Sequence, residues 1–145
     1  MENFENPQNS YVDSSTNNFP ITSTGNTFPS LNTPFNTTSG SISFSGSSAY
    51  STIPNNSAFV FNGDFTVECW TYLTSRAVSY PCVFSNYNSY TTGSLGLFAG
   101  HSSGSTTLYQ VALNGGGFPA IQSTTSIVYN TWVHLAVVRS SGVIT

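Results

Sequence analysis

The stretch GDFTVECWTYL, residues 63–73, decides the fold class of this chain. Side chains of an extended strand point alternately to its two faces, and this stretch has strand-forming residues at nearly every step. One face carries Phe65, Val67, Cys69, Thr71 and Leu73, and the other carries Thr66, Glu68, Trp70 and Tyr72. Because bulky side chains occur on both faces, we expect a central strand in a sheet that is at least partly covered on each side.

Further short strands are predicted around this stretch, at a spacing of about ten residues and separated by Gly, Pro and Asn. Residues 40–46 and 49–53 predict a hairpin that turns at Gly46-Ser47-Ser48. The later candidates are residues 81–85, 93–100, 106–113, 118–123, 131–139 and 143–145, with a hairpin turn predicted at Asn114-Gly115-Gly116-Gly117. No segment has a convincing helical period, so the sequence predicts an all-β, antiparallel sandwich or barrel.

The chain of 145 residues has room for one domain. Residues 1–9 are polar and without any period, which predicts a flexible N-terminal tail before a domain over residues 10–145. Within that domain, Phe19-Pro20-Ile21-Thr22 favours a short edge strand, because proline is admitted to strands mainly at edges and ends. The alternative is a long surface loop pinned by Phe19, Phe28 and Phe35, and the sequence leaves both open.

The charge pattern excludes several partners. Only 5% of the residues are charged, lysine is absent, and the cations are Arg76 and Arg139. Two arginines cannot neutralise a run of phosphates, so we expect neither nucleic acid nor an anionic membrane as a partner. No apolar run reaches the ~20 residues that span a bilayer, so we expect no membrane insertion.

The composition also indicates where the protein is expected to be located. The chain is rich in Ser, Thr and Asn, a composition common in extracellular and virion proteins. Its start has neither a basic region nor an apolar core, so no signal peptide is visible. We therefore expect an extracellular or virion surface, reached by assembly into a larger particle.

Three blocks of sequence, in this order, carry a family resemblance: residues 40–46, 65–70 and 132–139. They resemble the laminin-G-like domains of the concanavalin A-like lectin/glucanase superfamily. Asp13-Ser14-Ser15 and Pro34-Phe35 also resemble the lead-in of such domains in bacterial surface and phage structural proteins. The resemblance implies a jelly-roll sandwich of two antiparallel sheets that serves adhesion or glycan binding.

The C-terminal end departs from the family pattern. In the family, the strand that corresponds to residues 131–139 is followed by a turn and by further strands that close the sandwich, whereas this chain stops at Thr145. We therefore expect a domain that lacks its last strands, as a fragment or as a chain completed by another. Because an open strand edge recruits partner strands, other protein chains are possible partners.

Catalysis is not expected. Relatives of this fold include glycoside hydrolases, which need two carboxyl groups across the scissile bond. No such pair is present, because Asp64 lies at the start of the strand that carries Glu68. We expect Glu68 to bond to Arg139 or to backbone, and His134 to be a satisfied core residue. His101 lies in a Gly-Ser loop without an acidic neighbour.

No cofactor is expected, although calcium is possible because related domains often hold it at the rim of the sandwich. Calcium takes six to eight oxygen ligands, usually including carboxylates. The candidate ligands are Asp13, Asn62 and Asp64. The alternative is that both aspartates cap the backbone of their own turns.

The two cysteines, Cys69 and Cys82, are expected on adjacent strands of one hairpin that turns near residues 75–77. A disulfide across that loop would stabilise the fold by ~3 kcal/mol. The alternative, two buried free thiols, is favoured because no secretion signal is visible.

Glycan binding is the function for which specific residues can be named. Sugar sites combine flat aromatic faces with amide or hydroxyl groups, because the ring and its hydroxyls need different contacts. The loop of residues 86–92 has both. The candidate ligand-binding residues are Asn86, Tyr87, Asn88 and Tyr90, with His101, Tyr109 and Asn114 as weaker ones. The alternative is that the tyrosines only cover the edge of the sandwich.

The sequence therefore predicts a non-catalytic module that recognises carbohydrate, such as a glycan or surface polysaccharide, or that serves adhesion. One alternative is a structural or assembly module of a virion, in a tail fibre or associated with the capsid, completed by a partner chain. A second alternative is the remnant of a glycoside hydrolase-like domain.

Overall fold

The computed structural model describes residues 12–35, 40–75, 81–87, 92–100, 107–113 and 120–145. The chain divides into two compact units, residues 1–55 and 56–145, and each is described by itself. Within the described ranges, all regular elements are antiparallel β-strands apart from one short 3-10 turn. The predicted all-β class is confirmed. The predicted tail at residues 1–9 lies outside the described residues.

The first unit contains a two-stranded antiparallel sheet of β1 (Thr22–Ser30) and β2 (Ser41–Thr52). The hairpin predicted within residues 40–53 is wrong, because these residues form the single strand β2. Where a turn was predicted at Gly46 of β2, the ladder between β1 and β2 is irregular instead. The pairing shifts between Thr24 and Asn26 of β1, and Gly25 between them has φ +72°. A Cβ on Gly25 would lie 2.5 Å from the Ser48 carbonyl oxygen, so this close approach requires glycine.

The first unit also shows whether residues 19–22 form an edge strand or part of a long surface loop, the two alternatives that the sequence left open. The strand β1 begins at Thr22 and runs to Ser30, so it lies almost entirely beyond the predicted segment. Phe19 precedes the strand, in a turn where its backbone N–H donates to the Asp13 carboxylate. Phe28 lies within the strand, so a continuous surface loop is wrong as well.

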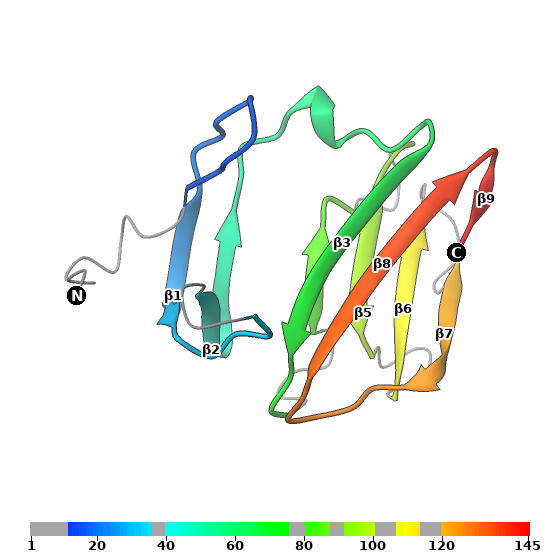
Figure 1. The fold of residues 1–145 in the computed structure, drawn as a ribbon. Helices are drawn as coiled ribbons and strands as arrows, with labels where there is room; N and C mark the ends of the chain where they lie inside the picture. The colour runs from blue at the N-terminus through cyan, green and yellow to red at the C-terminus, as the bar shows by residue number, and fades with distance from the viewer. Residues whose placement is uncertain (1–11, 36–39, 76–80, 88–91, 101–106, 114–119) are drawn as a thin grey trace. The chain divides into compact units, whose positions relative to one another are not determined.

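The second unit is a sandwich of two antiparallel sheets (Figure 1). One sheet has the order β3-β8-β9, formed by β3 (Phe65–Tyr72), β8 (Trp132–Ser140) and β9 (Val143–Ile144). The other has the order β4-β5-β6-β7, formed by β4 (Cys82–Ser85), β5 (Leu95–Ala99), β6 (Leu108–Leu113) and β7 (Ile121–Ser126). The turn η1 (Ser57–Phe59) precedes β3, and its Asn56 cap accepts a hydrogen bond from the N–H of Ala58.

The core of this unit lies between the two sheets. Leu95 and Leu97 of β5 and Val111 of β6 form one buried cluster with Val137 of β8. Phe65 and Val67 of β3 pack against the same cluster, as the alternation of the opening stretch predicts. Leu135 of β8 also packs against the core, and the alternate side chains on the opposite face of β3 and β8 therefore point away from the four-stranded sheet.

The prediction that the two cysteines lie on adjacent strands of one hairpin is wrong, whereas the favoured prediction of free thiols is confirmed. Cys69 lies on β3 and Cys82 on β4, and these strands belong to different sheets because β3 pairs with β8. Both thiols are free. Cys69 is half-buried, and desolvation raises the pKa of its thiol. Cys82 is exposed as a residue, yet desolvation raises the pKa of its thiol to about 11.

We expect the Cys69 thiol to resist alkylation at pH 8 in the folded chain, because it stays protonated there and the thiolate is the nucleophile. A Cys82→Ser variant isolates this thiol for reaction with iodoacetamide, followed by mass spectrometry. The reaction should become much faster in urea, where burial is lost. A wild-type chain that yields no titratable thiol after unfolding without reductant would contradict the free-thiol assignment.

Candidate functional site

Most of the aromatic side chains of β3 and β8 lie on the outward face of these two strands. The register places Tyr72 opposite Trp132, and Trp70 opposite His134, on neighbouring strands. The next row places Glu68 opposite Ala136. Because residues two apart on a strand share a face, these six side chains lie on one surface. We call the surface formed by Glu68, Trp70, Tyr72, Trp132, His134 and Ala136 the aromatic face.

The rings on this face form two cross-strand pairs. The ring centroids of Trp70 and His134 lie 5.0 Å apart with an interplanar angle of 38°. Those of Tyr72 and Trp132 lie 5.5 Å apart with an angle of 58°. Cross-strand aromatic contacts of this kind stabilise a sheet, so the rings have a structural role. Trp70 nevertheless keeps 43% of its surface exposed, which leaves area for a ligand.

A charged group borders the rings. The Glu68 carboxylate lies 3.3 Å from Nε2 of His134, and both side chains are exposed. Two predictions are therefore wrong: Glu68 pairs with His134 and not with Arg139, and His134 is an exposed residue rather than a core one. The cause is the register, which puts Arg139 opposite Phe65 at the far end of β3. There the guanidinium donates to the carbonyls of Asn62 and Gly63, the latter at 2.9 Å.

The aromatic face thus combines the two chemistries of a sugar site. The rings offer flat apolar surface, and the carboxylate and imidazole offer hydrogen-bonding groups beside it. Ala136, opposite Glu68, is exposed and has only a methyl group to occupy its place on the face. The sequence already showed that Trp132 and His134 share one face of their strand, and that Trp70 and Tyr72 share one face of theirs. The missing information was that these two strands pair.

The loop predicted to bind glycan is described only in part. Asn86 uses its amide to hold neighbouring segments together: its Oδ1 accepts the Leu95 N–H at 2.7 Å, and its Nδ2 donates to the Phe59 carbonyl. Tyr87 is half-buried, and its Cβ lies close to Gly96 of β5. Asn88, Tyr90, His101 and Asn114 lie outside the described residues, so their role stays a prediction.

Tyr109 does not contribute to a surface rim. It lies on β6 with 9% of its surface exposed and packs with Ala99 and Ile127 inside the sandwich. Desolvation is the main cause that raises the pKa of its phenol. The prediction of Tyr109 as a surface sugar contact is not supported by this placement, because the strand alternation turns the side chain toward the core.

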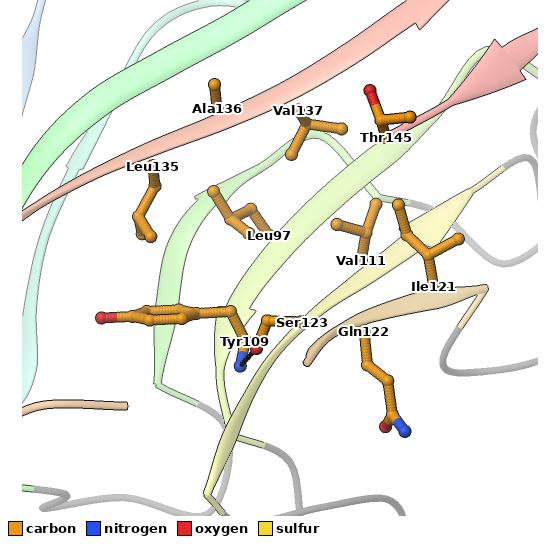
Figure 2. Close-up of a pocket in the computed structure, with 10 residues that line it drawn as sticks. All are labelled: Leu97, Tyr109, Val111, Ile121, Gln122, Ser123, Leu135, Ala136, Val137 and Thr145. Atoms are coloured by element: carbon orange, nitrogen blue, oxygen red, sulfur yellow. Dashed lines mark hydrogen bonds between the residues drawn. The ribbon is translucent and has the colours of Figure 1, made fainter. Parts of the chain in front are cut away.

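Two cavities open beside Tyr109, between the sheets. One, of about 170 Å³, is lined mainly by apolar side chains such as Leu97, Val111 and Leu135 (Figure 2). Gln122 and Ala136 contribute to its wall but point away from it (Figure 2). The other, of about 210 Å³, shares Tyr109, Ser123 and Leu135 with the first. Such apolar walls offer few partners for sugar hydroxyls, so these cavities are poor carbohydrate sites.

The calcium site predicted from Asp13, Asn62 and Asp64 stays a prediction. The Asp13 carboxylate caps its own turn, accepting hydrogen bonds from the Ser15 N–H and hydroxyl and from the Phe19 N–H. These bonds lower the pKa of Asp13. Asn62 and Asp64 belong to the other compact unit and supply one carboxylate between them. Within the described part of the chain, no three His, Cys, Asp or Glu side chains are grouped for a metal.

Comparison with known proteins identifies the family. A laminin-G-like family model, described as the concanavalin A-like lectin/glucanases superfamily, matches residues 45–145. The match begins within β2 and covers the whole of the 56–145 unit. No curated protein and no solved structure matches the chain. Among the described elements, no helix is long and apolar enough to cross a membrane.

Proposed function

Because the chain belongs to the concanavalin A-like lectin/glucanase superfamily, we propose that it is a non-catalytic module that binds carbohydrate through the aromatic face. Domains of the laminin-G-like type are typically non-catalytic binding modules, often for carbohydrate or adhesion. The observation that carries the proposal is the exposed Trp70 ring, held at 5.0 Å from His134 and next to a carboxylate. A ring fixed in this way loses little conformational entropy when a sugar packs on it.

The alternative of a glycoside hydrolase remnant receives less support. Hydrolysis would need two carboxyl groups facing one glycosidic bond. Glu68 is the one carboxylate within β3 and β8, and its neighbour on the face is His134. The Ser-, Thr- and Asn-rich composition supports a further part of the proposal, a location at a cell or virion surface.

Assembly with a partner chain is the second candidate function, favoured by the two apolar cavities between the sheets. β9 and β7 each form one edge of their sheet in the described part of the chain, and Thr145 and Ile121 both line the first cavity (Figure 2). Light scattering over a range of concentrations separates the two functions. A monomer at all concentrations would count against assembly between copies and leave carbohydrate binding standing.

The first experiment screens the full chain on an array of plant, bacterial and animal glycans, and then compares variants on the glycans that bind. Trp70→Ala should weaken binding by roughly tenfold or more, because truncation of a central aromatic contact has effects of this size. The matched control is Tyr129→Ala, which removes an exposed ring that lies outside the aromatic face. Circular dichroism melting would check that both variants fold. Unchanged binding by Trp70→Ala would refute the proposed site.

A further inference from the structure

We propose that the ligand of the aromatic face is a linear polysaccharide without acidic groups, lying along β3 and β8. This inference rests on the proposed function and adds the class of ligand. Three features of the face carry it: the spacing of its ring pairs, its position on strands, and its charge.

The spacing of the ring pairs favours a chain of sugars. The pair of Trp70 and His134 and the pair of Tyr72 and Trp132 occupy successive rows two residues apart. A strand rises ~3.4 Å per residue, so the rows are about 7 Å apart along the strands. A single sugar ring on Trp70 would leave the second row uncovered, whereas a chain in extended form can contact both.

The position on strands favours internal segments of a polymer over chain ends. A pocket that encloses a terminal sugar needs walls on several sides. The aromatic face is built from side chains of two adjacent strands, and neither of the two cavities is lined by Trp70, His134 or Glu68. Exposed Thr66, the next residue on this face of β3, continues it beyond Glu68 with a small polar side chain.

The charge of the face disfavours acidic sugars. Glu68 is well exposed beside Trp70, and its carboxylate can accept hydrogen bonds from sugar hydroxyls. A uronate, sialate or sulfate at the same place would be repelled. The compensating cations are scarce, because the register places Arg139 opposite Phe65, at the end of β3 away from the ring pairs, and Arg76 lies outside the described residues. The net charge of −3 acts in the same direction.

The test uses pairs of polymers that share a backbone and differ in charge. Affinity electrophoresis of the full chain would compare hydroxyethylcellulose with carboxymethylcellulose, and highly methyl-esterified homogalacturonan with the same polymer after de-esterification. We expect the neutral member of at least one pair to bind, and its acidic counterpart to bind on the order of five-fold more weakly at low salt. The difference should shrink as salt screens the charges. Affinity for neutral oligosaccharides of the bound backbone should rise from two units to longer chains.

Glu68→Gln should reduce the difference in affinity between the neutral and the acidic polymer of a pair. The matched control, Asp64→Asn, changes the net charge equally but four residues away, so it should preserve the difference. Stronger binding of the acidic members, or full affinity for a single sugar, would overturn the inference while leaving carbohydrate binding intact. Binding of no polymer or oligosaccharide, together with an empty glycan array, would overturn both proposals.

Discussion

Replacing Leu95 with alanine is expected to lower the free energy of unfolding of the 56–145 unit by about 2–5 kcal/mol. Leu95 is fully buried and belongs to the cluster that joins the two sheets through Leu97, Val111 and Val137. The substitution removes apolar contacts and leaves a cavity that β5 cannot close, because its backbone is bonded to strands on both sides. Since a whole domain is stable by only about 5–15 kcal/mol, this is a large share.

Urea unfolding followed by tryptophan fluorescence measures this effect, because both tryptophans, Trp70 and Trp132, lie in the 56–145 unit. The control is Val143→Ala, which truncates an apolar side chain of the same unit that is 64% exposed. It should change the free energy of unfolding by less than about 0.5 kcal/mol. A Leu95→Ala variant as stable as the control would show that the two sheets do not share this core.

Replacing Gln110 with methionine is expected to raise the free energy of unfolding by about 1–3 kcal/mol. Gln110 lies on β6 between Phe98 of β5 and Gln122 of β7, and it is completely buried. Neither polar atom of its amide has a hydrogen-bond partner among the described residues. A buried polar group without a partner loses its hydration and gains nothing in return. Methionine has nearly the same shape and removes that cost.

The same urea experiment tests this prediction, with Gln122→Met as the control. Gln122 pairs with Gln110 across the strands but is exposed, so its amide can be hydrated and the exchange should be nearly neutral. The sign of the effect at Gln110 is decisive. A loss of stability would mean that the amide forms a hydrogen bond that methionine cannot replace.

Alternation along single strands made much of the fold predictable. In residues 63–73 the period of two separated Phe65 and Val67, which pack in the core, from Glu68 and Trp70, which do not. The hairpin predicted around Gly46 failed because glycine permits a turn and an irregular step in a ladder equally well. Only the partner strand β1, which shifts register opposite that point, distinguishes the two.

The sequence could not predict that the residues of the aromatic face lie together on one surface. Trp70 and His134 are 64 positions apart in the chain, and Glu68 and His134 are 66 apart. Their contact depends on β3 pairing with β8 in one register, and a shift of one residue would turn every side chain of β8 to the other face.

The sequence by itself determined the all-β class, the family, the scarcity of cations and which residues share a face of each strand, because these are properties of composition and local period. The tertiary structure alone decided that Cys69 and Cys82 lie in different sheets, that His134 is exposed beside Glu68, and that Tyr109 is buried. These depend on which strands pair and which face is covered. Long-range packing sets both, and no local period encodes them.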